Sequence, residues 1–326
     1  METVTKSLSS FTLGDVVAFQ GLAMVPLFGE SADPDYLLLE EALRSGCAHV
    51  DEVSESGNVN QLLFVNHCER PVLLLDGEEI RGAKQNRVMN LTILVAAKSE
   101  LRIPVSCVEA GRWRHDGMEF APSKQMHYAQ GRSARMSQVS DNIRISQSRQ
   151  ADQGEVWNNI SQKMERMELH SPSAAMADAY DQSEDRLETY VQALRFVENQ
   201  VGAIFGIHGQ AMGLEYFDST TTYSRMHEKI VRSFALDAME RKGQEEVFTG
   251  EQATAFLNRV IASSMESFDA LGLGLDVRIM ASSVRGGALV ENGRVVHLCA
   301  FHVSEGAQTK NSSSRLARSS RRGQRY

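Results

Sequence analysis

VLLLDGEEIRGAKQNRVMNLTILVAAKSELRIPVSCVEAGRWRH, residues 72–115, is the stretch around which the chain is organised. Apolar runs at 72–75 and 91–97 have the length and composition of buried strands. Carboxylate, amide and guanidinium side chains lie between them, in DGEE at 76–79 and in GAKQNR at 82–87. Because convergent polar groups beside apolar segments are typical of binding and catalytic sites, a functional site is expected here.

The segments on either side predict an α+β fold, with a largely antiparallel sheet and hairpins packed against several long helices. Residues 201–217, VGAIFGIHGQAMGLEYF, predict a glycine-punctuated hairpin. Asn292-Gly293, between two apolar runs, predicts a second hairpin. Apolar residues three or four apart after Gln153 predict helices. Tight turns between neighbouring strands favour antiparallel pairing over a βαβ array.

Four parts are expected along the chain. Residues 1–122 form a mainly β part that carries the site. Residues 123–152, rich in Gln, Ser and Arg, form a polar loop or lid, with a weak helix as the alternative. Residues 153–305 supply helices and C-terminal hairpins, packed with the first part as one globular unit. Residues 306–326 form a disordered basic tail, because they contain almost nothing apolar to bury.

Charge and composition restrict the partners. The 326 residues carry a formal charge of −8, and the tail contributes six basic residues and no acid, which leaves the body near −14. An acidic body argues against nucleic-acid binding by the fold itself, while the tail could bind RNA. The chain has no signal-peptide pattern and no long apolar run, so no membrane association is expected. The four cysteines are widely separated without CxxC, which predicts a reduced, cytoplasmic protein; the oligomeric state is left open.

Three acids beside apolar strands are the candidate catalytic residues: Glu78, Glu79 and Glu109. Burial raises the pKa of a carboxyl group and a nearby cation lowers it, so such positions suit acid–base catalysis or metal ligation. Strand alternation places Glu78 and Glu79 on opposite faces. The structural alternative is that one is a solvated edge charge and the other pairs with Arg81 or Lys84. No residue pattern identifies a metal, and a divalent ion at these acids is left open as a cofactor.

The candidate ligand-binding residues follow directly. Lys84, Gln85, Asn86 and Arg87 combine two cations with two amides, a set suited to a phosphate and to a base or ribose edge. A polar surface turn is the alternative.

Two further residues, Arg112 and Trp113, could clamp or stack on an anionic ligand, although Trp113 could equally pack in a hairpin. Cys107 is expected to be a buried structural thiol, because no base adjoins it in sequence.

Several of these strings together resemble the ARG- and rhodanese-phosphatase-superfamily-associated protein domain. They are LDGEE (75–79), GAKQNR (82–87), IPVSCVE (103–109) and GRW (111–113), with GLEYFD (213–218) further along. The likeness extends over roughly residues 10–303. That family is named for its association with ADP-ribosylglycohydrolases and rhodanese-type phosphatases. The resemblance therefore implies a role in ADP-ribose, NAD-derived nucleotide or RNA-repair chemistry, and it carries no established reaction or residue role.

Three interpretations of the function follow. The first is an enzyme, a hydrolase that processes ADP-ribose-type or nucleotide phosphates. The second is a non-catalytic module that binds such a ligand or a partner. The third is a structural scaffold, in which the polar central stretch only satisfies backbone groups of an irregular sheet. A Glu carboxylate that shares one pocket with Lys84 or Arg87 favours the enzyme.

Overall fold

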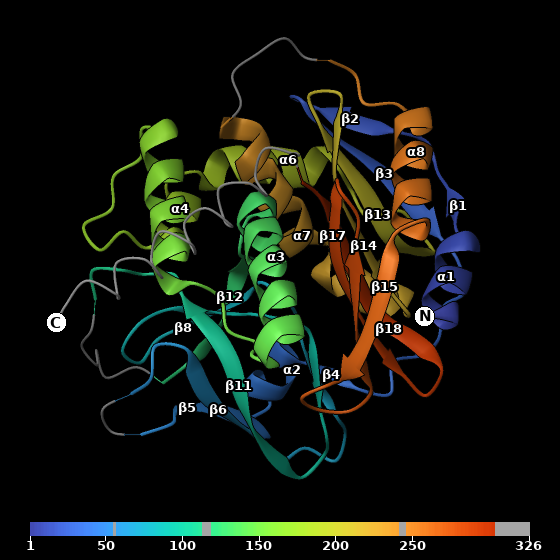
Figure 1. The fold of residues 1–326 in the computed structure, drawn as a ribbon. Helices are drawn as coiled ribbons and strands as arrows, with labels where there is room; N and C mark the ends of the chain where they lie inside the picture. The colour runs from blue at the N-terminus through green and yellow to red at the C-terminus, as the bar shows by residue number, and fades with distance from the viewer. Residues whose placement is uncertain (55–56, 113–118, 241–245, 304–326) are drawn as a thin grey trace, which may run out of the picture.

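The computed structural model describes residues 1–54, 57–112, 119–240 and 246–303. Three sheets and several helices form the described part of the chain (Figure 1). The largest sheet has nine strands in the order β1-β3-β13-β14-β18-β17-β16-β15, with β2 beside β3. Its strands are β1 (Thr12–Leu13), β2 (Val17–Phe19), β3 (Leu22–Phe28), β13 (Gln200–Ile207), β14 (Gln210–Phe217), β15 (Ser264–Asp269), β16 (Leu275–Met280), β17 (Val284–Glu291) and β18 (Arg294–His302).

The second sheet holds the stretch from which the sequence analysis started. It has six strands in the order β12-β8-β9-β11-β6-β5. They are β5 (Ala48–Glu52), β6 (Gln61–Asn66), β8 (Glu78–Arg81), β9 (Arg87–Met89), β11 (Ser99–Cys107) and β12 (Ala121–Met126). A small third sheet, β10-β7-β4, consists of β4 (Leu37–Leu38), β7 (Val72–Leu74) and β10 (Ile93–Val95). In it β4 pairs with β7 in parallel, whereas the pairs of the two larger sheets are antiparallel.

Helices cover both faces of the nine-stranded sheet. The helices are α1 (Glu2–Ser9), α2 (Leu39–Arg44), α3 (Ala129–Ser146), α4 (Gln153–Arg166), α5 (Met176–Asp181), α6 (Glu184–Ala193), α7 (Thr220–Glu240) and α8 (Gly250–Ile261). One face packs against α1 and α8, where Phe256 belongs to the same apolar core as Leu214. The other face packs against α7, where the rings of Phe205 and Phe234 stack 4.2 Å apart. Because α7 also contacts β12, it lies between the two large sheets.

Local sequence signals account for the predicted hairpins. His208 and Gly209 have φ values of +46° and +73° in the β13–β14 turn. Asn292 and Gly293, at +49° and +73°, join β17 to β18. Both hairpins and the largely antiparallel α+β class are confirmed. None of the described helices is long and apolar enough to cross a membrane.

The polar loop or lid predicted at 123–152 is wrong. This segment contains the end of β12 and the 18-residue helix α3. The buried face of α3 carries Arg132, Arg135 and Gln138 among its apolar residues. These polar side chains interrupt the apolar repeat on which a helix prediction depends, which is why the segment resembled a loop.

The prediction that all four cysteines are reduced is also wrong, because Cys47 and Cys68 form a disulfide. Strands β5 and β6 are antiparallel, with Ala48 opposite Asn66. The register therefore brings the flanking positions 47 and 68 together, which spacing along the chain does not reveal. Disulfides are rare in reducing compartments, so this bond argues against the predicted cytoplasmic location. That location stays a prediction.

Candidate functional site

The turn between β8 and β9 presents most of the residues predicted to bind a ligand. Gly82 opens it with φ +130° and Ala83 follows with φ +43°. A Cβ atom on Gly82 would lie 2.4 Å from the carbonyl oxygen of Glu119, far inside contact distance. Only glycine fits there, so the conformation that follows depends on it.

The end of β11 packs against this turn. Gln85 Nε2 donates to the backbone oxygen of Glu109 (2.8 Å), and the backbone amide of Asn86 donates to Glu109 Oε2 (3.2 Å). The exposed fractions of Gln85, Asn86 and Glu109 are 2%, 8% and 6%. Gln85 and Asn86 are thus held against Glu109, which lies 24 and 23 residues further along the chain, in one buried arrangement.

A third contribution comes from Arg112. Its Nη2 donates to Glu109 Oε2 (2.8 Å) and to Asn86 Oδ1 (3.2 Å), and its Nη1 donates to the backbone oxygen of Ala83 (2.8 Å). Arg112 keeps 15% of its side chain exposed, and Lys84 is half-buried. We call this group the turn cluster, which consists of Lys84, Gln85, Asn86, Arg87, Glu109 and Arg112.

Arg87 is the fully buried cation of the turn cluster, with no exposed surface. Its Nη1 donates to Gln85 Oε1 (3.3 Å). Burial lowers the pKa of Arg87, an effect that the nearby charges of Glu52 and Glu109 oppose and that of Arg112 reinforces. A cation withdrawn from water in this way gains from an additional anion.

Glu52, at the end of β5, adjoins the turn cluster and was missed by the sequence analysis. A Cβ atom on Gly57 would lie 3.1 Å from Lys84 Nζ and 3.3 Å from Glu52 Oε2, so the two side chains approach each other there. Both carboxylate oxygens of Glu52 are buried without a hydrogen-bond partner among the described residues. Nothing in AHVDE (48–52) distinguishes this acid from any exposed strand residue.

The other two predicted acids lie elsewhere. Glu78 Oε1 is 3.0 Å from Lys229 Nζ of α7, whereas Glu79 Oε2 is 3.1 Å from Arg81 Nε and accepts from Ser123 Oγ (2.6 Å). The two side chains point to opposite faces, as alternation predicts. Burial raises the pKa of Glu79, and Arg81 acts against that shift. Glu109 is therefore the predicted acid that the fold brings to Lys84–Arg87.

Cys107 is buried, as expected, and burial raises the pKa of its thiol. Gln153 of α4 accepts from its backbone amide and donates to its carbonyl, both at 2.8 Å. Trp113 and the basic tail lie outside the described residues.

A second group, which the sequence analysis did not predict, lies between the sheets. We call it the buried ion cluster: Asp76, Arg132, Arg135, Glu215 and His297. Arg132 Nε is 3.0 Å from Asp76 Oδ1, and its Nη1 is 2.6 Å from Glu215 Oε1. Arg135 Nη2 is 3.1 Å from the same Asp76 oxygen, and His297 Nε2 is 3.2 Å from Glu215 Oε2. All five side chains are at most 2% exposed.

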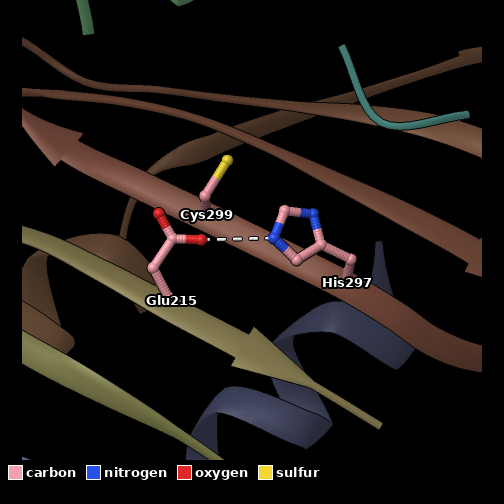
Figure 2. Close-up of side chains that lie close together, drawn as sticks. All are labelled: Glu215, His297 and Cys299. Carbon is pink, nitrogen blue, oxygen red and sulfur yellow. Dashed lines mark hydrogen bonds and ion pairs between the residues drawn. The ribbon is translucent and has the colours of Figure 1, made fainter. Parts of the chain in front are cut away.

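Histidine and cysteine adjoin this cluster. Arg135 Nη1 contacts His127 Nδ1 at 2.6 Å, and burial, reinforced by Arg135, lowers the pKa of His127 well below 6.5. The thiol of Cys299 lies beside Glu215 and His297 (Figure 2), and burial raises its pKa well above 9.0. Asp76 and Glu215 lie in LDGEE and GLEYFD, two of the strings that carry the family resemblance.

Fold and sites together define a class: an α+β protein whose internal polar residues gather in two buried clusters, one at a sheet end and one between sheets. The chain belongs to the ARG and Rhodanese-Phosphatase-superfamily-associated Protein domain family, ARPP-1, whose model matches residues 10–301. No curated protein and no solved structure matches it. The family name supplies a context and no reaction.

Proposed function

We propose that this protein binds a phosphate-bearing nucleotide of the ADP-ribose or NAD-derived class at the turn cluster. The observation that carries the proposal is that three cations, Lys84, Arg87 and Arg112, lie on or contact the β8–β9 turn at one end of the six-stranded sheet. Arg112 Nη2 donates to Asn86 Oδ1 (3.2 Å) and Arg87 Nη1 donates to the backbone oxygen of Asn86 (3.5 Å), so both guanidinium groups contact the same residue. Guanidinium and ammonium groups gathered in this way suit a phosphate or diphosphate.

The amides have a supporting role in this proposal. Gln85 donates to Glu109, while Asn86 Oδ1 accepts from Arg112 and from the amide of Gly82 (3.3 Å). These bonds hold the turn in place. We therefore assign contact with the phosphates to Lys84 and Arg112, which keep exposed surface. The buried Arg87 adds positive charge behind them, and Gln85 and Asn86 preorganise the cations.

Hydrolysis of the bound nucleotide is a second candidate, and Glu52 favours it. A buried carboxylate without a hydrogen-bond partner among the described residues, beside Lys84, has the surroundings of a general base. Glu109 is less suited to that role, because Arg112 and the amide of Asn86 already engage its Oε2. A non-catalytic binding module is what remains if Glu52 has no chemical role.

A thermal-shift series with ADP-ribose, NAD, ADP and adenosine tests the binding proposal. A ligand that binds only the folded state raises the melting temperature, so the three phosphate-bearing compounds should raise it and adenosine should not. Lys84→Ala should reduce the shift. Lys98→Ala is the matched control. Lys98 is half-exposed and directly precedes the first residue of β11, at the opposite end of that strand from the turn cluster. No shift with any phosphate-bearing compound would refute the proposal.

Glu52→Gln separates hydrolysis from binding. If Glu52 is the base, the variant keeps its thermal shift while turnover of ADP-ribose, followed by chromatography of the products, falls by about 100-fold or more. Equal turnover in both proteins would remove Glu52 from the mechanism. RNA binding through residues 306–326 is a separate proposal. It predicts that truncation after Glu305 lowers RNA affinity and its dependence on salt.

A further inference from the structure

Glu215, His297 and Cys299 bring three kinds of metal-ligating atom together in the interior (Figure 2). The pairing of β14 with β18 explains why. Glu215 lies opposite Cys299 in the register, and His297 is two residues before Cys299 on the same strand. Because residues two apart share a face of a strand, all three side chains point to the same side of the sheet. Their ligand atoms lie within 4.8 Å of one another.

We propose that these three residues bind a divalent transition-metal ion of the zinc class. Thiolate, imidazole and carboxylate together match the preferences of zinc better than those of calcium or magnesium, which take oxygen ligands. Tetrahedral zinc holds its ligand atoms at about 2.0–2.3 Å, so these atoms lie about 3.3–3.8 Å from one another. His297 Nε2 and Glu215 Oε2, 3.2 Å apart, are already near that spacing. Metal binding would therefore require mainly a movement of Cys299 Sγ toward these two atoms.

Outer contacts hold two of the ligands in position. His297 Nδ1 contacts Thr92 Oγ1 at 2.8 Å, which leaves Nε2 directed at Glu215. The other oxygen of Glu215 is held by Arg132 Nη1 at 2.6 Å. Metal-binding histidines and carboxylates typically have such partners, which fix their orientation and tune their affinity. These contacts therefore fix the orientation of His297 and Glu215.

Asp76 gives an independent observation. Its side chain is about 1% exposed, and its Oδ2 has no hydrogen-bond partner among the described residues. Asp76 and Cys299 line the same small cavity, of about 10 Å³, which is enough for the centre of one water molecule. A water molecule held against Asp76 in this cavity would supply the fourth ligand of the ion.

The charges of the cluster change little when an ion binds. Without metal, Asp76 and Glu215 balance Arg132 and Arg135, and a divalent ion together with a Cys299 thiolate adds a net charge of about +1. Without metal, His297 Nε2 and Glu215 Oε2 form a hydrogen bond, and the Cys299 thiol lies beside them. The two states differ in metal content, so measurement separates them.

The test uses the full chain, with Zn²⁺ and Co²⁺ as probes. The purified protein should contain about one ion per chain by elemental analysis, or take up one in titration. Bound Co²⁺ should show the sulfur-to-metal charge-transfer absorption of a cobalt thiolate. Cys299→Ser should abolish this absorption and Cys107→Ser should not. Cys107 is the matched control because it is the other free, buried cysteine of the described chain.

A second measurement does not depend on variants that fold. Removal of metal from the wild-type protein by a strong chelator should lower its melting temperature, and Zn²⁺ should restore it. The inference is overturned if the protein neither contains nor takes up either ion. It is also overturned if the cobalt absorption follows Cys107 instead of Cys299. Neither readout involves the turn cluster, so a failure here leaves the proposed nucleotide site untouched.

Discussion

Arg132 Nη1 lies 2.6 Å from Glu215 Oε1, and neither side chain has any exposed surface. The pair joins α3 to β14 in the middle of the nine-stranded sheet. Burial of two charges costs desolvation free energy, and their mutual attraction offsets that cost only while both partners are present. Removal of one partner therefore leaves a charge in the interior without its counter-ion.

The first prediction concerns Arg132→Met. This change leaves Glu215 and Asp76 without their shared cation, so the free energy of unfolding should fall by about 3–5 kcal/mol. Arg225→Met is the control, because Arg225 is half-exposed and pairs with Glu41 on the surface; it should cost less than about 1 kcal/mol. Urea denaturation measures both. Equal costs would show that the buried pair is not held as described.

The second prediction concerns pH. Burial raises the pKa of Asp218 from 3.8 to about 6, against the effects of Tyr36 and Arg294. Between these values the folded protein holds a proton that the unfolded chain releases, so this group's stabilising contribution is lost as pH rises from about 4 to about 6. A shift of this size corresponds to about 3 kcal/mol.

Asp218→Asn removes that titration and isolates it from other groups. The free energy of unfolding of the wild type, minus that of Asp218→Asn, should fall by up to about 3 kcal/mol between pH 4 and pH 7. Urea denaturation at several pH values gives this difference. A constant difference would mean that Asp218 titrates normally in the folded protein.

The third prediction compares two glycines with positive φ. Gly82→Ala places a Cβ 2.4 Å from the backbone oxygen of Glu119, so it should destabilise the protein by more than about 2 kcal/mol. Gly46, at φ +71°, has nothing within 4 Å of its would-be Cβ. Gly46→Ala should therefore lower the free energy of unfolding only by the cost of a non-glycine residue at positive φ, about 1 kcal/mol. If Gly82→Ala were no worse than Gly46→Ala, the described turn would be incorrect.

The fourth prediction concerns the disulfide between Cys47 and Cys68, which are 21 residues apart. A closed loop of that length stabilises a folded chain by about 3 kcal/mol. Cys47→Ser should lose that amount, and a reducing agent should destabilise the wild type but not the variant. In denaturant without reductant, thiol titration should detect Cys107 and Cys299 alone. Four reactive thiols would contradict the bond.

Sequence reasoning succeeded where the signal is local. The Asn292-Gly293 hairpin, the helix from Gln153 and the opposite faces of Glu78 and Glu79 all follow from turn chemistry or from the period of a helix or strand. The turn cluster was partly predictable, because Lys84–Arg87 are contiguous.

Features made by contacts across the chain were not predictable. Glu52 lies on β5, which β11 and β6 separate from β9 in the six-stranded sheet, so its approach to Lys84 near Gly57 has no local signal in the sequence. Arg132 and His297 meet through Glu215, 83 and 82 residues away. Buried arginines also conceal their own helix, because they occupy positions where a pattern search expects apolar residues.

Calorimetric titration of ADP-ribose into the wild type, Lys84→Ala and Lys98→Ala tests the central claim most directly. Saturable binding to the wild type and to Lys98→Ala is expected, with affinity for Lys84→Ala lower by about 10-fold, the loss of one charge-assisted contact. Wild-type binding should also weaken as salt rises, because the contacts are ionic. An absence of binding heat, or equal affinity in all three proteins, would contradict a nucleotide site at the turn cluster.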